Sequence, residues 1–135
     1  MKKAILLLAI TMSIAFISCS KKDDSTTTSV TKATIVLTTS AGKPASGITV
    51  YAFDQDKWTV IGDDPLFANG SAASDSSGKA IFSNIEYSNV FTTINNNQNT
   101  FRFSAHYTIS GVNKTKVTAV TFTKGEQKTV NLQLN

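Results

Sequence analysis

Residues 100–110, TFRFSAHYTIS, decide the fold class, because their side chains alternate in polarity along the whole stretch. The apolar positions are Phe101, Phe103, Ala105, Tyr107 and Ile109. The polar positions between them are Arg102, Ser104, His106 and Thr108. A period of two places these sets on opposite faces of an extended chain. The stretch therefore predicts a long strand with one buried and one solvated face.

Two further strands are predicted on the C-terminal side of this stretch. Gly111-Val112-Asn113 provides a turn before a strand at residues 115–123, and Lys124-Gly125-Glu126 provides a turn before a strand at residues 129–134. In the last strand Val130, Leu132 and Leu134 share one face. We expect these three strands to form an antiparallel meander.

Short strands are also predicted on the N-terminal side, at residues 33–38, 48–53 and 80–83, with a short third strand at residues 57–61 between them. Turn-forming residues separate these segments, and no helical pattern is long enough to compete. About seven short strands with turns at this spacing are typical of two packed sheets. We expect an all-β fold, a single antiparallel β-sandwich that spans residues 32–135 and is transthyretin-like or immunoglobulin-like.

Two hairpin sequences carry a family resemblance. GKPASGITV at residues 42–50 and SDSSGKAIFSNI at residues 74–85 resemble the paired signature of transthyretin-like and carboxypeptidase-regulatory-like sandwich domains. Some relatives of transthyretin hydrolyse 5-hydroxyisourate with an N-terminal histidine, an arginine and a Tyr-Arg-Gly-Ser ending. This chain departs from that pattern, because His106 lies in mid-strand and the sequence ends in LQLN. The resemblance therefore implies the fold without implying that reaction.

Residues 1–18 have the organisation of a secretory signal peptide. A basic start, Met1-Lys2-Lys3, precedes the apolar run AILLLAITMSIAFI at residues 4–17. As a helix this run would rise only about 21 Å, short of the ~30 Å hydrocarbon core of a bilayer. The run ends in FISC at residues 16–19, which resembles a lipobox and predicts acylation, for example with palmitate, at Cys19. The alternative is an ordinary secretory leader followed by a chance cysteine.

Residues 19–31 are predicted to form an acylated, flexible tether. Their composition is dominated by Ser, Thr, Lys and Asp, which cannot form a core, and as a flexible coil they would span about 20 Å. KKDDS at residues 21–25 is similar to the export tags of some surface lipoproteins. We therefore expect a protein anchored in the outer membrane by its N-terminal lipid and exposed at the cell surface. The alternative is an anchor on the periplasmic face.

Charge and cysteine content exclude several classes of site. Removing Lys2 and Lys3 from the 13 basic residues leaves 11 against nine acidic ones, so no strongly basic face for nucleic acid is expected. Cys19 is the one cysteine, which excludes an intrachain disulfide and a cysteine-based metal site. We expect no nucleic-acid partner, no cofactor and no bound metal.

Histidine and aspartate are the candidates for chemistry. His106, the one histidine, is expected on the polar face of its strand, where an exposed or hydrogen-bonded role is the commoner one. A catalytic triad would require a serine, His106 and a carboxylate to converge within about 3 Å in a cleft. A calcium site would need several aspartates, but none falls in a recognised loop spacing. The aspartates considered are Asp54, Asp56, Asp63, Asp64 and Asp75.

Two long loops, residues 54–71 and 88–99, are the candidate recognition segments. The predicted ligand-binding residues are Trp58, Asp63, Asp64, Phe67 and Asn96. A glycan site would present Trp58 flat and exposed beside Asn or Asp side chains. In the alternative interpretation Trp58, Leu66 and Phe67 close one end of the core.

These observations favour a non-catalytic binding or structural module whose ligand is a protein or a glycan. The alternative is a small hydrolase or ligand-processing enzyme on a transthyretin-like scaffold. The oligomeric state cannot be inferred from the sequence.

Overall fold

A computed structural model describes residues 28–135 of the chain. The expectations for the signal peptide, for Cys19 and for most of the tether concern residues outside this range. Within it, no helix is long and apolar enough to span a membrane.

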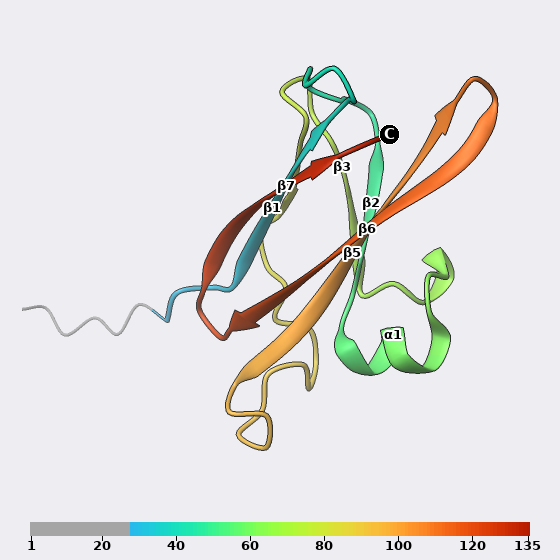
Figure 1. Cartoon of the computed structure of the whole chain (residues 1–135). Helices are drawn as coiled ribbons and strands as arrows, with labels where there is room; N and C mark the ends of the chain where they lie inside the picture. Colours follow the sequence, from blue (N-terminus) through green and yellow to red (C-terminus); the bar gives the residue numbers. More distant parts are fainter. Residues whose placement is uncertain (1–27) are drawn as a thin grey trace, which may run out of the picture.

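Seven strands in two sheets form an all-β sandwich, which confirms the predicted fold class (Figure 1). One sheet has the order β4-β1-β7 and the other the order β3-β2-β5-β6. The elements are β1 (Lys32–Thr38), β2 (Thr49–Phe53), α1 (Gln55–Ile61), η1 (Pro65–Phe67), β3 (Gly70–Ala73), β4 (Lys79–Phe82), β5 (Gln98–Ile109), β6 (Val112–Thr123) and β7 (Gln127–Gln133). Here η1 denotes a turn of 3₁₀-helix.

The core lies between the two sheets and follows the alternation predicted for β5. Phe101, Phe103, Ala105 and Tyr107 are buried, and the first two stack with ring centroids 6.2 Å apart. The exception is Ile109, which is exposed because it lies at the end of the β5–β6 hairpin, and this end projects beyond the other strands (Figure 1). The facing sheet contributes buried side chains from β1, β4 and β7, namely Ala33, Ile35, Leu37, Ala80, Phe82 and Leu132.

The strand predicted at residues 57–61 is wrong, because this segment belongs to α1. Asp54 caps the helix by accepting a hydrogen bond from the Lys57 N–H at 2.9 Å, and Gly62 ends the helix with a φ of 80°. A cap and a glycine stop outweigh the strand preference of a short apolar run. The strand that lies nearby is β3, which the sequence patterns did not indicate.

The predicted C-terminal meander is only half right. β5 and β6 form the expected antiparallel hairpin through Ser110 and Gly111, which have φ of 51° and 78°. β7, however, crosses to the other sheet and runs parallel to β1 from Lys32↔Gln127 to Thr38↔Gln133, so the sandwich is not purely antiparallel. In this position Leu132 is buried against the core.

The turn at residues 75–79 explains part of the second hairpin signature. Gly78 has a φ of +80°, and a Cβ there would overlap the backbone oxygen of Leu37. Asp75 accepts hydrogen bonds from the Ser77 N–H and hydroxyl and from the Lys79 N–H. The bonds from Lys79 and Ser77 lower the pKa of the Asp75 carboxyl. Asp75 is therefore a turn residue.

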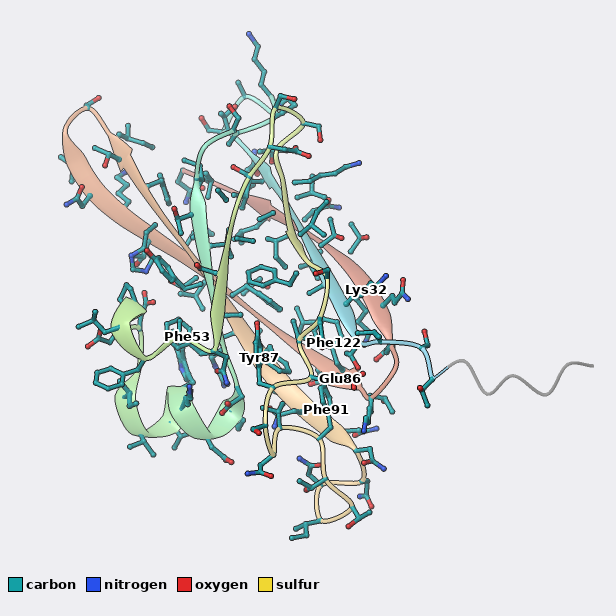
Figure 2. The ribbon with its side chains drawn as sticks, turned by 180° about the vertical axis from the view of Figure 1, so that it is seen from behind. Lys32, Phe53, Glu86, Tyr87, Phe91 and Phe122 are labelled. Atoms are coloured by element: carbon teal, nitrogen blue, oxygen red, sulfur yellow. The ribbon has the colours of Figure 1, made fainter. Side chains whose placement is uncertain are left out.

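The folded part of the chain already includes Thr31, where the tether was expected to end. Thr31 is fully buried, and its N–H and hydroxyl donate to Glu86 Oε1 at 2.8 and 2.7 Å. Its hydroxyl oxygen accepts from the Gly125 N–H at 2.6 Å. Hydrogen bonds from Thr31 lower the pKa of Glu86. Glu86 thus fastens the entry of the chain to the segment after β4, close to the start of β1 (Figure 2).

Candidate functional site

Residues 54–69, which connect β2 to β3, form the most distinctive surface segment. α1 packs beside β5 at one end of the four-stranded sheet. The two ends of the segment are tied together, because the Asp54 N–H donates to Asn69 Oδ1 at 2.8 Å and Asn69 Nδ2 donates to Asp54 Oδ2 at 2.7 Å. Asp54 is buried, and as cap and Asn69 partner it uses both carboxylate oxygens. The segment is therefore held in one conformation at its base.

Trp58 is a half-buried anchor of this segment. Its ring packs edge-on against buried Phe53, with centroids 5.5 Å apart (Figure 2 labels Phe53 beside α1). The Arg102 guanidinium lies 5.6 Å from the Trp58 ring centre and donates to Gln55 Oε1 at 2.5 Å. The indole is thus contacted by Phe53 and Arg102. It does not have the open, flat presentation that a glycan platform requires.

Apolar side chains that follow Trp58 point into solvent. Leu66 is 88% exposed, Val60 is 83% exposed and Phe67 is 49% exposed. We call Val60, Leu66 and Phe67 the apolar display surface. The interpretation in which Leu66 and Phe67 close the core is therefore wrong, and only Trp58 packs inward. The physical reason is the local cap, because Asp64 Oδ1 accepts from the Leu66 N–H at 3.0 Å and starts η1 away from the sheet.

Asp63 fastens the middle of the segment to the outer face of β5. Its Oδ2 accepts a hydrogen bond from Ser104 Oγ at 2.8 Å, and its Oδ1 lies 3.0 Å from His106 Nε2. Tyr51 packs edge-on against the His106 ring at 4.9 Å. Ser104 and His106 are two residues apart on one strand face, so a single carboxylate reaches both.

This Ser–Asp–His cluster has the wrong order for nucleophilic catalysis. A triad places the histidine between serine and carboxylate, so that the imidazole removes the serine proton. Here the Asp63 carboxylate lies between them and itself accepts the hydrogen bond from the Ser104 hydroxyl. Ser104 is also fully buried, so no substrate reaches its oxygen. The cluster is a structural clamp that holds residues 62–64 on the sheet.

The aspartates do not gather into a metal site. Across residues 28–135, no group of three His, Cys, Asp or Glu side chains lies close enough to hold a metal ion. Asp54 and Asp64 cap helical turns, Asp63 bonds to β5, and Asp75 organises a turn.

Asn96, the fifth predicted ligand-binding residue, lies on a different part of the surface. It has a φ of 55° and lines a depression of about 600 Å³ with Asn97, Lys124 and residues 28–30. A separate groove of about 540 Å³ lies between α1 and the second loop and is lined by Gln55, Asp56, Asn89, Thr92, Ile94, Asn95, Gln98, Asn99, Thr100 and Thr121. The structure therefore groups Trp58, Asp63, Asp64 and Phe67 on one segment, and it leaves Asn96 apart.

Two amide side chains of that groove form hydrogen bonds that fix the second loop. Asn95 and Asn99 both donate to the Val90 carbonyl, at 2.9 and 2.8 Å, and Asn99 Oδ1 accepts from the Gln55 N–H at 3.1 Å. The second loop is thereby fixed to the start of α1.

Sequence reasoning did not single out Val60 or Ser104, and it considered Leu66 only as a residue that closes the core. The caps Asp54 and Asp64 are the signal that could have placed Val60 on a helix rather than on a strand, and Leu66 on a turn of 3₁₀-helix. No protein-family model matches the chain, and a search of the curated proteins finds no match. Residues 54–69 thus combine two helix caps, the clamp at Asp63 and exposed apolar side chains.

Proposed function

We propose that this protein is a lipoprotein anchored through Cys19 in the outer membrane, exposed at the cell surface, with a transthyretin-like sandwich that acts as a non-catalytic binding module. The signal-peptide pattern of residues 1–18, the single cysteine at its end and the polar segment after it support the anchor. The observation that carries the binding role is the apolar display surface, three exposed apolar side chains on a segment fastened at both ends and in its middle.

A protein partner fits this surface better than a glycan. Large apolar side chains exposed on one segment favour a partner that removes them from water, and a pre-organised segment loses little entropy on binding. A glycan would use an open aromatic face, and Trp58 is contacted by Phe53 and Arg102.

The anchor is tested by fractionation of the producing cells. Cys19→Ala should move the protein from the membrane fraction to the soluble fraction, because one cysteine carries the expected lipid. Cys19→Ser is the matched control and should behave in the same way. Unchanged partitioning of both variants would contradict lipid anchoring.

The binding role is tested by site-specific photo-crosslinking on intact cells. A photoreactive amino acid at Leu66 should give one discrete crosslinked product. The same amino acid at Ile94, which is 94% exposed on the other long loop, is the matched control and should not. The proposal fails if the two positions give the same products, or if Leu66 gives none.

A further inference from the structure

The outer edge of β6 is open over much of its length. β6 pairs with β5 along its whole length and ends the order β3-β2-β5-β6. Near its C-terminal end the edge is closed by side chains. Lys128 Nζ donates to the Thr121 backbone carbonyl at 2.6 Å, and the Thr123 N–H donates to Glu126 Oε2 at 2.9 Å. These side-chain bonds mark the odd-numbered residues of β6 as those whose backbone groups point away from β5.

The remaining odd-numbered residues form what we call the open edge, Asn113, Thr115, Val117 and Ala119. In an antiparallel pair, alternate residues direct both N–H and C=O outward, so these four present a continuous row of donors and acceptors. Within residues 28–135 no backbone group of this row has a hydrogen-bond partner outside the sheet. An unpaired row of this kind is a template for an added strand.

Two lysines give the open edge a positive charge. Lys114 and Lys116 lie opposite Tyr107 and Ala105, on the same face of the sheet, and Lys114 is exposed while Lys116 is half-buried. In the part of the chain that the structure describes, neither lysine forms an ion pair. A hollow of about 390 Å³, lined by Lys114 and residues of both strands, lies beside the start of the edge. On the opposite face Val117 is partly exposed.

We propose that the open edge of β6 binds an extended acidic segment of another protein as an additional β-strand. Backbone hydrogen bonds to the four odd-numbered residues would supply the pairing, and alternate acidic side chains would lie beside Lys114 and Lys116. A second copy of this chain is disfavoured as occupant, because β6 against β6 would bring two further lysines to the same face of the joined sheet. The proposal is independent of the apolar display surface.

The test uses the full chain in detergent micelles and a labelled synthetic peptide in which Glu and Val alternate, followed by fluorescence anisotropy. The peptide should bind, and binding should weaken as salt is raised, because charge attraction between exposed groups is screened. Val117→Pro should weaken binding by about tenfold or more. Proline removes one outward N–H and leaves the bonds to β5 intact, so circular dichroism should remain that of the native chain.

A second variant and a control peptide test the binding of the acidic peptide even if Val117→Pro fails to fold. Lys114→Gln combined with Lys116→Gln should weaken binding and flatten its salt dependence without altering the backbone. Leu66→Ser should bind as the native chain does, which separates this edge from the proposed function. The inference is overturned if the acidic peptide does not bind, or if a peptide alternating Lys and Val binds equally well. It is also overturned if sedimentation shows dimers that Val117→Pro dissociates, since the occupant is then a second copy.

Discussion

The two long connections of the sandwich, residues 54–69 and residues 83–97, are similar in length but use their apolar side chains in opposite ways. The second connection buries most of them, with Ile94 as the exception. Ile85 and Val90 belong to the core, and Tyr87 and Phe91 pack against Phe101 with ring centroids 6.3 and 6.0 Å away (Figure 2). The first connection is fastened mainly by polar groups, with Trp58 packed on Phe53, and it exposes the apolar display surface.

The difference shows that a connection held by polar groups at its base and in its middle can leave apolar side chains exposed. Asp54, Asp63 and Asn69 form the hydrogen bonds that hold the first connection, so the side chains of the apolar display surface are not needed for attachment. The second connection also has polar anchors, from Thr31 to Glu86 and from Asn99 to the Val90 carbonyl, and in addition it packs Ile85 into the core. Substitutions in the two connections should therefore have different costs.

The largest effect is expected in the second connection. Ile85→Ala should lower the free energy of unfolding by about 2–5 kcal/mol, because Ile85 is fully buried and its removal leaves a cavity. Urea unfolding of the detergent-solubilised chain would measure it. Ile94→Ala is the matched control in the same connection and should stay within ~0.5 kcal/mol of the native chain. Equal losses for the two variants would contradict the assignment of Ile85 to the core.

A smaller loss is expected from the polar base of the first connection. Asp54→Ala should cost about 1–3 kcal/mol, because it removes the α1 cap and leaves Asn69 Nδ2 without its acceptor. The same unfolding experiment measures this value. Asp56→Ala, an exposed aspartate in the first turn of α1, should cost less than ~1 kcal/mol. If the two aspartates were equivalent, the polar-anchor explanation for this connection would be lost.

The Glu86 carboxylate, the titratable anchor described for the second connection, predicts that stability depends on pH. Hydrogen bonds from Thr31 hold the pKa of folded Glu86 below its ordinary value of 4.5. A carboxyl whose folded pKa is lowered contributes stability above its unfolded pKa, and this contribution is lost as the pH falls through the folded pKa. Glu86→Gln should therefore lose less stability on acidification from neutral pH than the native chain.

Parallel urea titrations of native chain and Glu86→Gln at several pH values would measure this difference. Asp75 and Glu126, whose pKa values are also lowered, are present in both proteins, so their contributions cancel in the difference between the two pH profiles. An identical pH dependence in both would show that Glu86 titrates in the same way in the folded and unfolded chains.

The alternation of side chains along the strands made much of the fold predictable. The capped helix α1 and the crossing of β7 to the other sheet were not predicted. The period of two in residues 100–110 correctly assigned Phe101, Phe103 and Tyr107 to the core, because every second residue of a strand shares a face. The parallel pairing of β7 with β1 was not predictable, since alternation specifies which face is buried and leaves the partner strand open.

The candidate site was less predictable than the fold, for a related reason. Asp63 was selected as a possible ligand-binding residue, but its contacts are Ser104 and His106, 41 and 43 positions away in the chain. Contacts over such separations depend on how a connection lies across the sheet, which no local pattern encodes. Residue type indicated that a histidine and a carboxylate were available, and only the geometry shows that the carboxylate lies between Ser104 and His106.

The smallest effect is expected from Leu66, and it bears most directly on the proposed function. Leu66→Ser should change the free energy of unfolding by no more than ~0.5 kcal/mol, because an 88% exposed side chain loses almost no contacts. The urea midpoint and the slope of the transition should both match those of the native chain. A loss above about 1 kcal/mol would mean that Leu66 packs against the sandwich in solution. In that case the first connection would resemble the second, and the apolar display surface would not exist.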